Sequence, residues 1–214
     1  REEQDESDDI ASAELRRAMK ATAGLSEGSA KGASAFAVLR AAASTAAAAK
    51  KRSAIVRSAV ETLKNPSPTN AAWAARVLVF TGSKREVDLI ADRIRAAVPQ
   101  ALVWAADGDT STREREKIRK AYMTSTVPAC IVGTGHAWGE SSNLQDTDLQ
   151  ILGALPWTWG MLRQWIGRAR RKGQLRKLRI QLFSAQGTHD DRVFPKVCAK
   201  LAQAGDLIPD SQID

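Results

Sequence analysis

The chain has 214 residues, 43% of them hydrophobic and 26% charged, a composition typical of a globular α/β domain with room for an appendage. Its 32 Lys and Arg residues exceed its 24 Asp and Glu residues, and the formal net charge of +8 favours a polyanionic partner. The sequence holds no apolar run of the ~20 residues that a membrane span needs, and it opens without a signal segment. We therefore expect no membrane partner and a cytoplasmic location, with the nucleoid or nucleus as alternatives.

The residues that commonly bind metals are too few and too scattered for a metal site. The sequence has two cysteines, Cys130 and Cys198, and two histidines, His136 and His189. Neither cysteine has the paired spacing of a zinc or redox motif, so we predict that both are buried apolar residues and that the chain holds no metal itself.

Residues 1–70 are predicted to form a helical, partly disordered appendage or linker. An acidic start leads into an alanine-rich stretch, and alanine favours helix while adding little to a core. Apolar residues then recur with the spacing of an amphipathic helix, at Ile55, Val56, Ala59, Val60 and Leu63. Pro66 and Pro68 end this helix. Because the chain opens on Arg1 within a charged run, we interpret it as a piece of a longer protein.

From residue 71 to 205 short apolar runs alternate with helical segments, a pattern that predicts a doubly wound α/β domain with a parallel sheet. The predicted strands span 77–80, 101–105, 129–132, 150–155 and 178–183. The predicted helices span 86–97, 112–123, 159–169 and 190–202, and 206–214 is a tail. Ligands of such sheets bind beyond the carboxyl ends of the strands, where the site is expected.

The most informative local pattern is Q-x-x-G-R-x-x-R followed by Lys-Gly-Gln, at residues 164–174. If the segment is helical, Gln164, Arg168 and Arg171 share one face. Fixed planar guanidinium groups of this kind stabilise the charge that develops during phosphoryl transfer. The simpler interpretation, a solvated basic helix or one that only touches phosphates, stays open at this point.

This pattern resembles the sixth conserved motif of Snf-type superfamily 2 helicases, and other segments resemble further motifs in the right order. Residues 77–84 resemble the fourth motif, and 130–148 resemble the fifth. Residues 108–122 resemble the segment that joins a glycine, a Ser/Thr cluster and an arginine to a helix. Residues 187–192 resemble the ending that follows the sixth motif. The resemblance covers about residues 73–204 and implies a RecA-like fold, the second of two in a DNA translocase.

The resemblance also implies roles for individual residues. Arg168 lies near the γ-phosphate, Arg171 is the arginine finger, and Gln164 couples nucleotide to motion. The implied ATP contacts are Gly139, Trp165, Arg168 and Arg171. The implied contacts to the nucleic-acid backbone are Thr81, Ser83, Lys84, Gly108, Arg113, Thr134 and Gly135. Because such contacts read no bases, binding without sequence preference is expected. The resemblance to Snf-type translocases implies double-stranded DNA as the partner.

The fifth motif departs from the family pattern in ways that put strand contact and coupling in doubt. Trp138 is bulky where small residues are common, Glu140 is negative near a phosphate-binding surface, and an extra residue precedes Asn143. His136 in the same loop is interpreted as a hydrogen-bonding residue rather than a proton carrier.

No segment fits the phosphate-binding loop G-x-x-x-x-G-K-(S/T), since 24–31 and 82–84 each lack part of it. ATP and Mg²⁺ are therefore expected to be bound mainly by a separate P-loop RecA-like domain, in cis or in trans, and the chain alone is expected to be inactive. Two other interpretations stay open: a non-enzymatic nucleic-acid-binding or regulatory RecA-like module, and an interaction protein whose alanine-rich N-terminus docks a partner helix.

Overall fold

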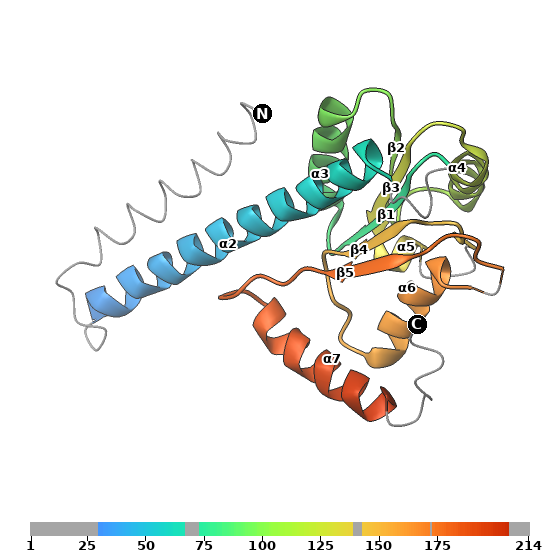
Figure 1. The fold of residues 1–214 in the computed structure, drawn as a ribbon. Helices are drawn as coiled ribbons and strands as arrows, with labels where there is room; N and C mark the ends of the chain where they lie inside the picture. Colours follow the sequence, from blue (N-terminus) through green and yellow to red (C-terminus); the bar gives the residue numbers. More distant parts are fainter. Residues whose placement is uncertain (1–29, 67–72, 139–142, 172, 206–214) are drawn as a thin grey trace.

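The computed structural model describes residues 30–66, 73–138, 143–171 and 173–205, which form a five-stranded parallel sheet with helices on both faces (Figure 1). The elements in chain order are α2 (Ala30–Lys64), β1 (Arg76–Thr81), α3 (Lys84–Ala97), β2 (Leu102–Ala106), α4 (Thr112–Thr124), β3 (Ala129–Thr134), α5 (Gly135–Trp138), β4 (Leu149–Leu152), α6 (Trp159–Ala169), β5 (Arg179–Leu182) and α7 (Asp190–Gly205). The predicted α/β class and parallel sheet are confirmed. Sequence reasoning missed the short helix α5, and the expected acidic start and the tail at 206–214 lie outside the described residues.

The strand order β2-β3-β1-β4-β5 makes β1 the central strand. The chain leaves β1 over α3 towards β2, and then returns over α4, α5 and α6 through β3 and β4 to β5. Because parallel crossovers are right-handed, connections that run in opposite directions place their helices on opposite faces. Accordingly, α3 packs on one face, and α4, α5 and α6 pack on the other.

The sheet separates two apolar cores. Every residue of β1 is buried, as expected for a continuous apolar run in a strand covered on both sides. Val77 and Val79 point into the core beneath α2 and α3, whereas Leu78 and Phe80 point into the core beneath α4, α6 and α7. Alternate residues of one strand thus hold both layers of helices onto the sheet.

The second half of α2 belongs to the domain, which differs from the predicted appendage ending at residue 70. Ile55, Val56, Ala59 and Leu63 are each at most 2% exposed and lie in the same core as α3. Burying each of the larger aliphatic side chains contributes about 1.5–3 kcal/mol. The domain therefore begins within α2, because the amphipathic stripe read from the sequence covers the sheet itself.

Polar contacts fix α2 along β5 and α7. The Ser58 hydroxyl donates to Gln181 Oε1 at 2.5 Å, and Arg179 Nη2 donates to the Thr62 hydroxyl at 2.9 Å. The described first half of the helix extends beyond the sheet (Figure 1). Near the middle of the helix, Lys51 forms a 2.8 Å ion pair with Asp190, the first residue of α7.

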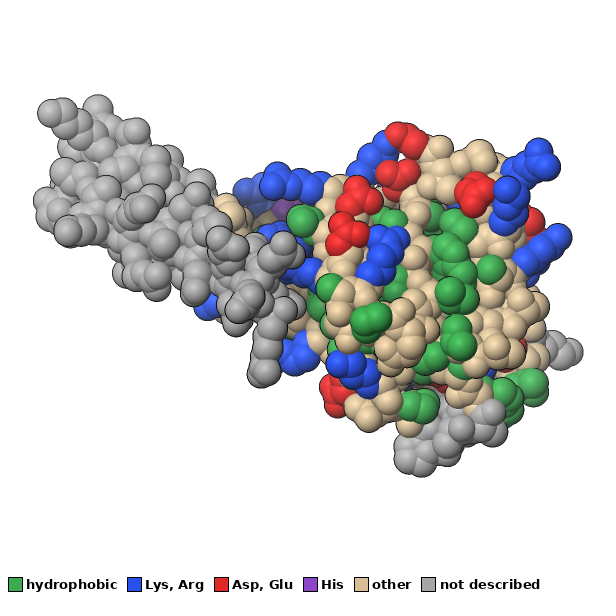
Figure 2. Space-filling view, turned by 90° about the horizontal axis from the view of Figure 1, so that it is seen from above, with side chains coloured by type: hydrophobic (Ala, Val, Ile, Leu, Met, Phe, Trp, Pro, Cys, Tyr) green, Lys and Arg blue, Asp and Glu red, His purple; other side chains and the backbone are tan. Residues whose placement is uncertain are grey.

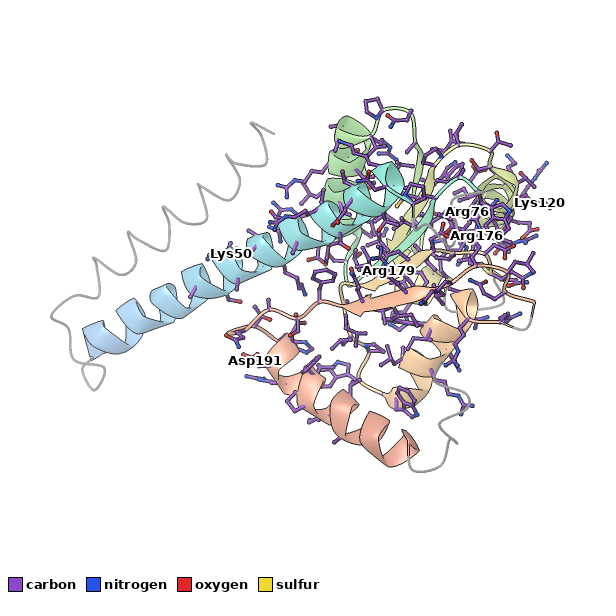
Figure 3. All side chains as sticks on the ribbon, viewed as in Figure 1. Lys50, Arg76, Lys120, Arg176, Arg179 and Asp191 are labelled. Carbon is purple, nitrogen blue, oxygen red and sulfur yellow. The ribbon has the colours of Figure 1, made fainter. Side chains whose placement is uncertain are left out.

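A buried ionic network holds the amino ends of the strands. Asp148 Oδ2 accepts hydrogen bonds from the Arg76 backbone N–H at 2.6 Å and from Arg176 Nη1 at 2.8 Å. Arg76 and Arg176 lie close to each other beside the sheet (Figure 3). Burial, followed by repulsion from Arg176, lowers the pKa of Arg76 from its ordinary value. This network is at the edge of the sheet opposite the carboxyl ends.

The face of the molecule seen in Figure 2 is not marked as a binding face by its charge. On the side seen in Figure 2, Lys and Arg side chains are interspersed with Asp and Glu side chains and with apolar ones. Among the described residues no helix is both long and apolar enough to cross a membrane. The topology of the sheet is therefore the better guide to the site.

Candidate functional site

The chain reverses its direction of travel across the sheet between two neighbouring strands, β1 and β3. The chain leaves β1 towards one edge and leaves β3 towards the other, and Thr81 and Thr134 are register partners at the ends of these strands. Open α/β sheets bind their ligands beyond the carboxyl ends of the strands at this kind of reversal. The candidate site is therefore the carboxyl edge around Thr81 and Thr134.

At the end of β1, Thr81 is buried and its hydroxyl donates to the Ser83 carbonyl at 3.2 Å. Ser83 caps α3, because its hydroxyl accepts from the Glu86 N–H at 3.3 Å and its backbone is extended. Ser83 and the next residue, Lys84, are exposed. Of the three positions expected to contact nucleic acid here, two present their side chains to solvent and Thr81 braces the turn.

At the end of β2, residues 107–110 form a tight turn. The Asp107 N–H donates to the Thr110 hydroxyl at 3.0 Å, and the Asp109 N–H donates to Asp107 Oδ1 at 2.9 Å. Gly108 lies exposed in this turn, and Arg113 lies exposed in the first turn of α4. The turn adjoins the end of β1, because Lys84 forms ion pairs with Asp107 at 3.7 Å and with Asp109.

At the end of β3, the chain turns directly into α5. The Thr134 hydroxyl accepts from the Ala137 N–H at 3.3 Å, and Gly135 is buried against Trp165. A Cβ atom at Gly135 would lie 2.2 Å from Trp165 Cζ2, so only glycine allows this contact. His136 is exposed, with its ring centroid 5.9 Å from that of Trp165. Gly139, expected to contact ATP, lies outside the described residues.

The arginine segment begins in α6, which is capped by the Thr158 hydroxyl and ends at Ala169. Gln164 is exposed and Arg168 is half-buried on this helix. Arg171 lies beyond the end of the helix, exposed, with its Nε donating to the Gly167 carbonyl at 3.3 Å. The prediction that Gln164, Arg168 and Arg171 share one helical face is therefore wrong for Arg171, because the segment leaves the helix at Arg170.

Trp165 faces the core instead of the surface. Its side chain is 5% exposed and its ring meets that of Phe80 edge-on at 5.9 Å. Its carbonyl accepts from Gln150 Nε2 at 2.8 Å. The expectation that Trp165 touches a nucleotide does not fit this burial. The regular spacing of Leu162, Trp165 and Ala169, all buried, is the sequence signal that would have assigned it to the core.

Sequence reasoning missed the link between the arginine segment and the chain that leaves the fifth motif. The Leu144 N–H donates to the Arg168 carbonyl at 2.9 Å, and Gln174 contacts the backbone of Asp146 and Thr147. These contacts bring the end of the predicted fifth motif and the arginine segment together at the amino end of β4, on the opposite side from the carboxyl edge. No sequence pattern predicts these hydrogen bonds, because the residues that form them are far apart in the chain.

The donors at the carboxyl edge suit phosphate groups better than a metal ion. Lys84 and the short hydroxyls there are of the kind that hold phosphate oxygens. Arg168 and Arg171 lie towards the opposite end of the sheet, because α6 runs back to the turn at residues 143–148 that precedes β4. In the parts of the chain that the structure describes, no three His, Cys, Asp or Glu side chains come together as metal ligands. Asp107 and Asp109, which lie at the carboxyl edge, are instead paired with Lys84.

A parallel sheet with this order of strands, with helices on both faces and exposed polar turns at its carboxyl edge, is typical of RecA-like helicase domains. Residues 58–173 match the family described as "Helicase conserved C-terminal domain", and the chain belongs to that family. The resemblance to Snf-type superfamily 2 C-terminal domains is thereby confirmed.

Among curated proteins, the chain is similar to the SWI/SNF-related matrix-associated actin-dependent regulator of chromatin subfamily A-like protein 1 of Xenopus tropicalis. The two are 30% identical over 134 residues, which is 61% of this chain and 14% of the relative. The Bos taurus protein of the same name is 29% identical over 133 residues, with the same coverage. The chain thus spans a small part of the length of these relatives.

Among solved structures, the C-terminal part of the Fun30 ATPase domain superposes with a TM-score of 0.54 at 18% identity, over 67% of this chain and 44% of that one. The Escherichia coli DEAD-box protein SrmB gives a TM-score of 0.52 at 21% identity, over 69% of this chain and 77% of that one. The DUF1998 helicase MrfA, bound to DNA and AMPPNP, gives 0.51 at 19% identity, over 68% of this chain and 19% of that one. These likenesses establish the RecA-like fold.

Proposed function

We propose that this chain is the second motor domain of an ATP-dependent DNA translocase or helicase. In this role it completes an ATP site whose P-loop belongs to another RecA-like domain, upstream in the same polypeptide or on a separate chain. The observation that carries the proposal is the 2.9 Å hydrogen bond between the Leu144 N–H and the Arg168 carbonyl, which joins the nucleic-acid-facing fifth motif to the arginine segment. A translocase needs a structural link of this kind between its ATP site and its DNA-binding surface.

The proposed catalytic residues are Arg171, Arg168 and Gln164. Bound ATP, with its Mg²⁺, supplies the phosphoanhydride bond whose hydrolysis drives motion, and both are held mainly by the P-loop domain. Arg171 is exposed and always charged, so it can reach across to a neighbouring domain and stabilise negative charge that develops on the γ-phosphate. Arg168 is half-buried and binds a phosphate oxygen on the side of the ATP nearer this domain. Gln164 is exposed and couples the bound nucleotide to the closure of the two RecA-like domains.

The proposed DNA-binding surface is the carboxyl edge of the sheet at β1, β2 and β3. Ser83, Lys84 and Arg113 are exposed there, and Thr134 and Gly108 lie in turns at the same edge. Such groups bind phosphates without reading bases, so we propose binding without sequence preference. We propose double-stranded DNA as the partner because of the resemblance to Snf-type translocases. We propose that the protein acts where DNA is found, in the cytoplasm, the nucleoid or the nucleus.

The experiment is DNA-stimulated ATP hydrolysis by the complete protein that contains this chain and its P-loop domain. Arg171→Ala should lower kcat by about 10³-fold or more while duplex binding is retained, because it removes a transition-state charge partner. Arg163→Ala is the matched control, since Arg163 is exposed on the same helix, α6, and has no proposed role. The 214-residue chain alone should not hydrolyse ATP.

The alternative is a non-enzymatic nucleic-acid-binding RecA-like module. Normal hydrolysis by Arg171→Ala would refute the finger assignment. If, in addition, no P-loop partner restores ATPase activity to the chain and it still binds duplex DNA, the module is the correct function.

A further inference from the structure

The segment that carries Arg171 is fastened at both ends to one turn, at residues 143–148. At its start, the Arg168 carbonyl accepts from the Leu144 N–H at 2.9 Å. At its end, Gln174 Oε1 accepts from the Asp146 N–H at 2.5 Å, and Gln174 Nε2 donates to the Thr147 carbonyl at 3.1 Å. Arg171 lies between these two fastenings.

The turn is a firm anchor because the protein interior holds it. The Thr147 hydroxyl donates to the Leu144 carbonyl at 2.8 Å and lies 2.9 Å from the Tyr122 hydroxyl, and both Thr147 and Tyr122 are fully buried. Asp146 has a φ of 65°, a left-handed conformation that non-glycine residues adopt only where their surroundings impose it. The Gln174 hydrogen bond to the Asp146 N–H is one of the contacts that impose it.

The Arg171 backbone lies outside the regular hydrogen bonding of helix α6. Helix α6 ends at Ala169, so the regular helical hydrogen bonds stop before Arg171. Gly173 has a φ of 91°, which reverses the chain so that Gln174 points back at the turn. The Gln174 N–H donates to the Arg171 carbonyl at 3.1 Å, so a shift of Gln174 moves Arg171 directly.

From this geometry we propose that Gln174 is a positioning residue for the arginine finger. The inference rests on the proposed function, because it takes Arg171 to be the group that meets the γ-phosphate. In this role Gln174 acts through Arg171 and not through a contact of its own with nucleotide or DNA. Its amide fixes the angle at which Arg171 leaves the domain and ties that angle to the turn that follows the fifth motif.

The test uses Gln174→Met in the complete ATPase with saturating duplex DNA. Methionine keeps the length of the side chain but makes neither backbone hydrogen bond. We expect kcat to fall about 10- to 100-fold, because small misplacements of a catalytic group have effects of that size, while KM for ATP and the affinity for duplex change little. Gln174→Glu keeps the acceptor for the Asp146 N–H and loses the donor, so its kcat should lie between wild type and Gln174→Met.

The matched control is Gln186→Met, since Gln186 is exposed and lies away from the arginine segment, in the loop between β5 and α7. A merely structural role of Gln174 is recognised by a lowered melting temperature with an unchanged kcat per folded molecule, and this outcome overturns the proposal. A kcat for Gln174→Met within about twofold of wild type overturns it as well.

A double-mutant comparison separates this inference from the proposed function. If Gln174 acts through Arg171, then Gln174→Met has no further effect on kcat in an Arg171→Ala background. A further loss in that background overturns the positioning role while leaving Arg171 as the finger. A normal kcat for Arg171→Ala alone instead overturns the proposed function.

Discussion

Lys84 and Asp109 form an ion pair although their strands, β1 and β2, are not neighbours in the sheet. Lys84 opens α3 directly after the turn that follows β1, and Asp109 lies in the turn after β2. Since β3 lies between these strands, the ion pair crosses the carboxyl end of β3, where Thr134 lies. A carboxylate therefore occupies the lysine that we expect to contact a DNA phosphate.

Neutralising this carboxylate is expected to strengthen DNA binding. Exposed ion pairs contribute about 0.2–1 kcal/mol, so Asp109→Asn should raise the affinity for duplex DNA by up to about fivefold. One added phosphate contact should also steepen the dependence of log K on log salt by about 0.9. Fluorescence anisotropy with a labelled duplex at several salt concentrations measures both quantities.

The same substitution in a Lys84→Met background shows whether the gain in DNA affinity depends on Lys84. With Lys84 removed, Asp109→Asn should change the affinity much less. An equal gain in both backgrounds means that Asp109 acts through general repulsion of DNA, and the competition model is then wrong.

The close contact between Gly135 and Trp165 predicts that adding one methyl group at residue 135 lowers the stability of the fold. A Cβ at Gly135 would lie 2.2 Å from the Trp165 ring, which is held in the core beside Phe80. Gly135→Ala should lower the free energy of unfolding by about 1–3 kcal/mol, the usual range for overpacking. Urea unfolding followed by tryptophan fluorescence provides the measurement.

Gly160→Ala is the control for this substitution. A Cβ at Gly160 meets no atom within 4 Å, and Gly160 is the second residue of helix α6. Alanine there should leave stability unchanged or raise it by up to about 0.5 kcal/mol, because helix propensity counts less in the first turn than in the interior. Equal effects of the two substitutions would mean that the Gly135 contact does not limit packing.

The sequence was sufficient to predict the strands and most helices, because these elements carry local signals. The run at 77–80 is apolar on both faces and so had to be a covered strand, and Ser83, Ser111 and Thr158 each precede a helix that they cap. The arginine segment was found for the same reason, since its residues are adjacent in the chain.

The contacts that arrange the site are not local and could not be predicted in that way. The end of α6 before Arg171 depends on Gly173 and on Gln174 reaching a turn 28 residues earlier in the sequence. The Lys84–Asp109 pair depends on the order of the strands, which the alternating pattern leaves open. The burial of α2 depends on which face of the sheet other helices leave uncovered, and the residues of α2 alone do not show that.

The buried ion pair between Asp148 and Arg176 predicts a large cost when one partner is removed. Their side chains are 3% and 4% exposed, so Arg176→Met removes a buried positive charge that pairs with the Asp148 carboxylate. Stability should fall by about 3–5 kcal/mol, as measured by urea unfolding. Lys117→Met, at an exposed pair with Glu114 at 3.2 Å, should change stability by less than about 1 kcal/mol.

A small effect of Arg176→Met would show that water or the nearby Arg76 compensates Asp148. The cation–π contact of Arg176 with Trp73, at 5.3 Å to the ring centroid, is lost in the same variant. Trp73→Leu measures this second contribution separately and should cost about 0.5–1 kcal/mol.

Cys130 predicts a loss of stability at alkaline pH. Burial in the central sheet raises the pKa of its thiol, so the folded chain keeps the thiol protonated. In the unfolded chain the thiol ionises above pH ~8.5. The contribution of this thiol to stability is therefore complete below that pH and is lost as the pH rises, by about 1.4 kcal/mol per pH unit.

Urea unfolding between pH 7.5 and 9.5 in a Cys198→Ala background isolates this effect. Cys130→Ala should abolish most of the slope above pH ~8.5, although it lowers stability at every pH by leaving a small cavity. The same burial should protect Cys130 from Ellman's reagent until the chain unfolds, since the thiolate is the reactive form. Rapid labelling of the folded protein, or a slope that survives Cys130→Ala, would assign the alkaline loss to another group.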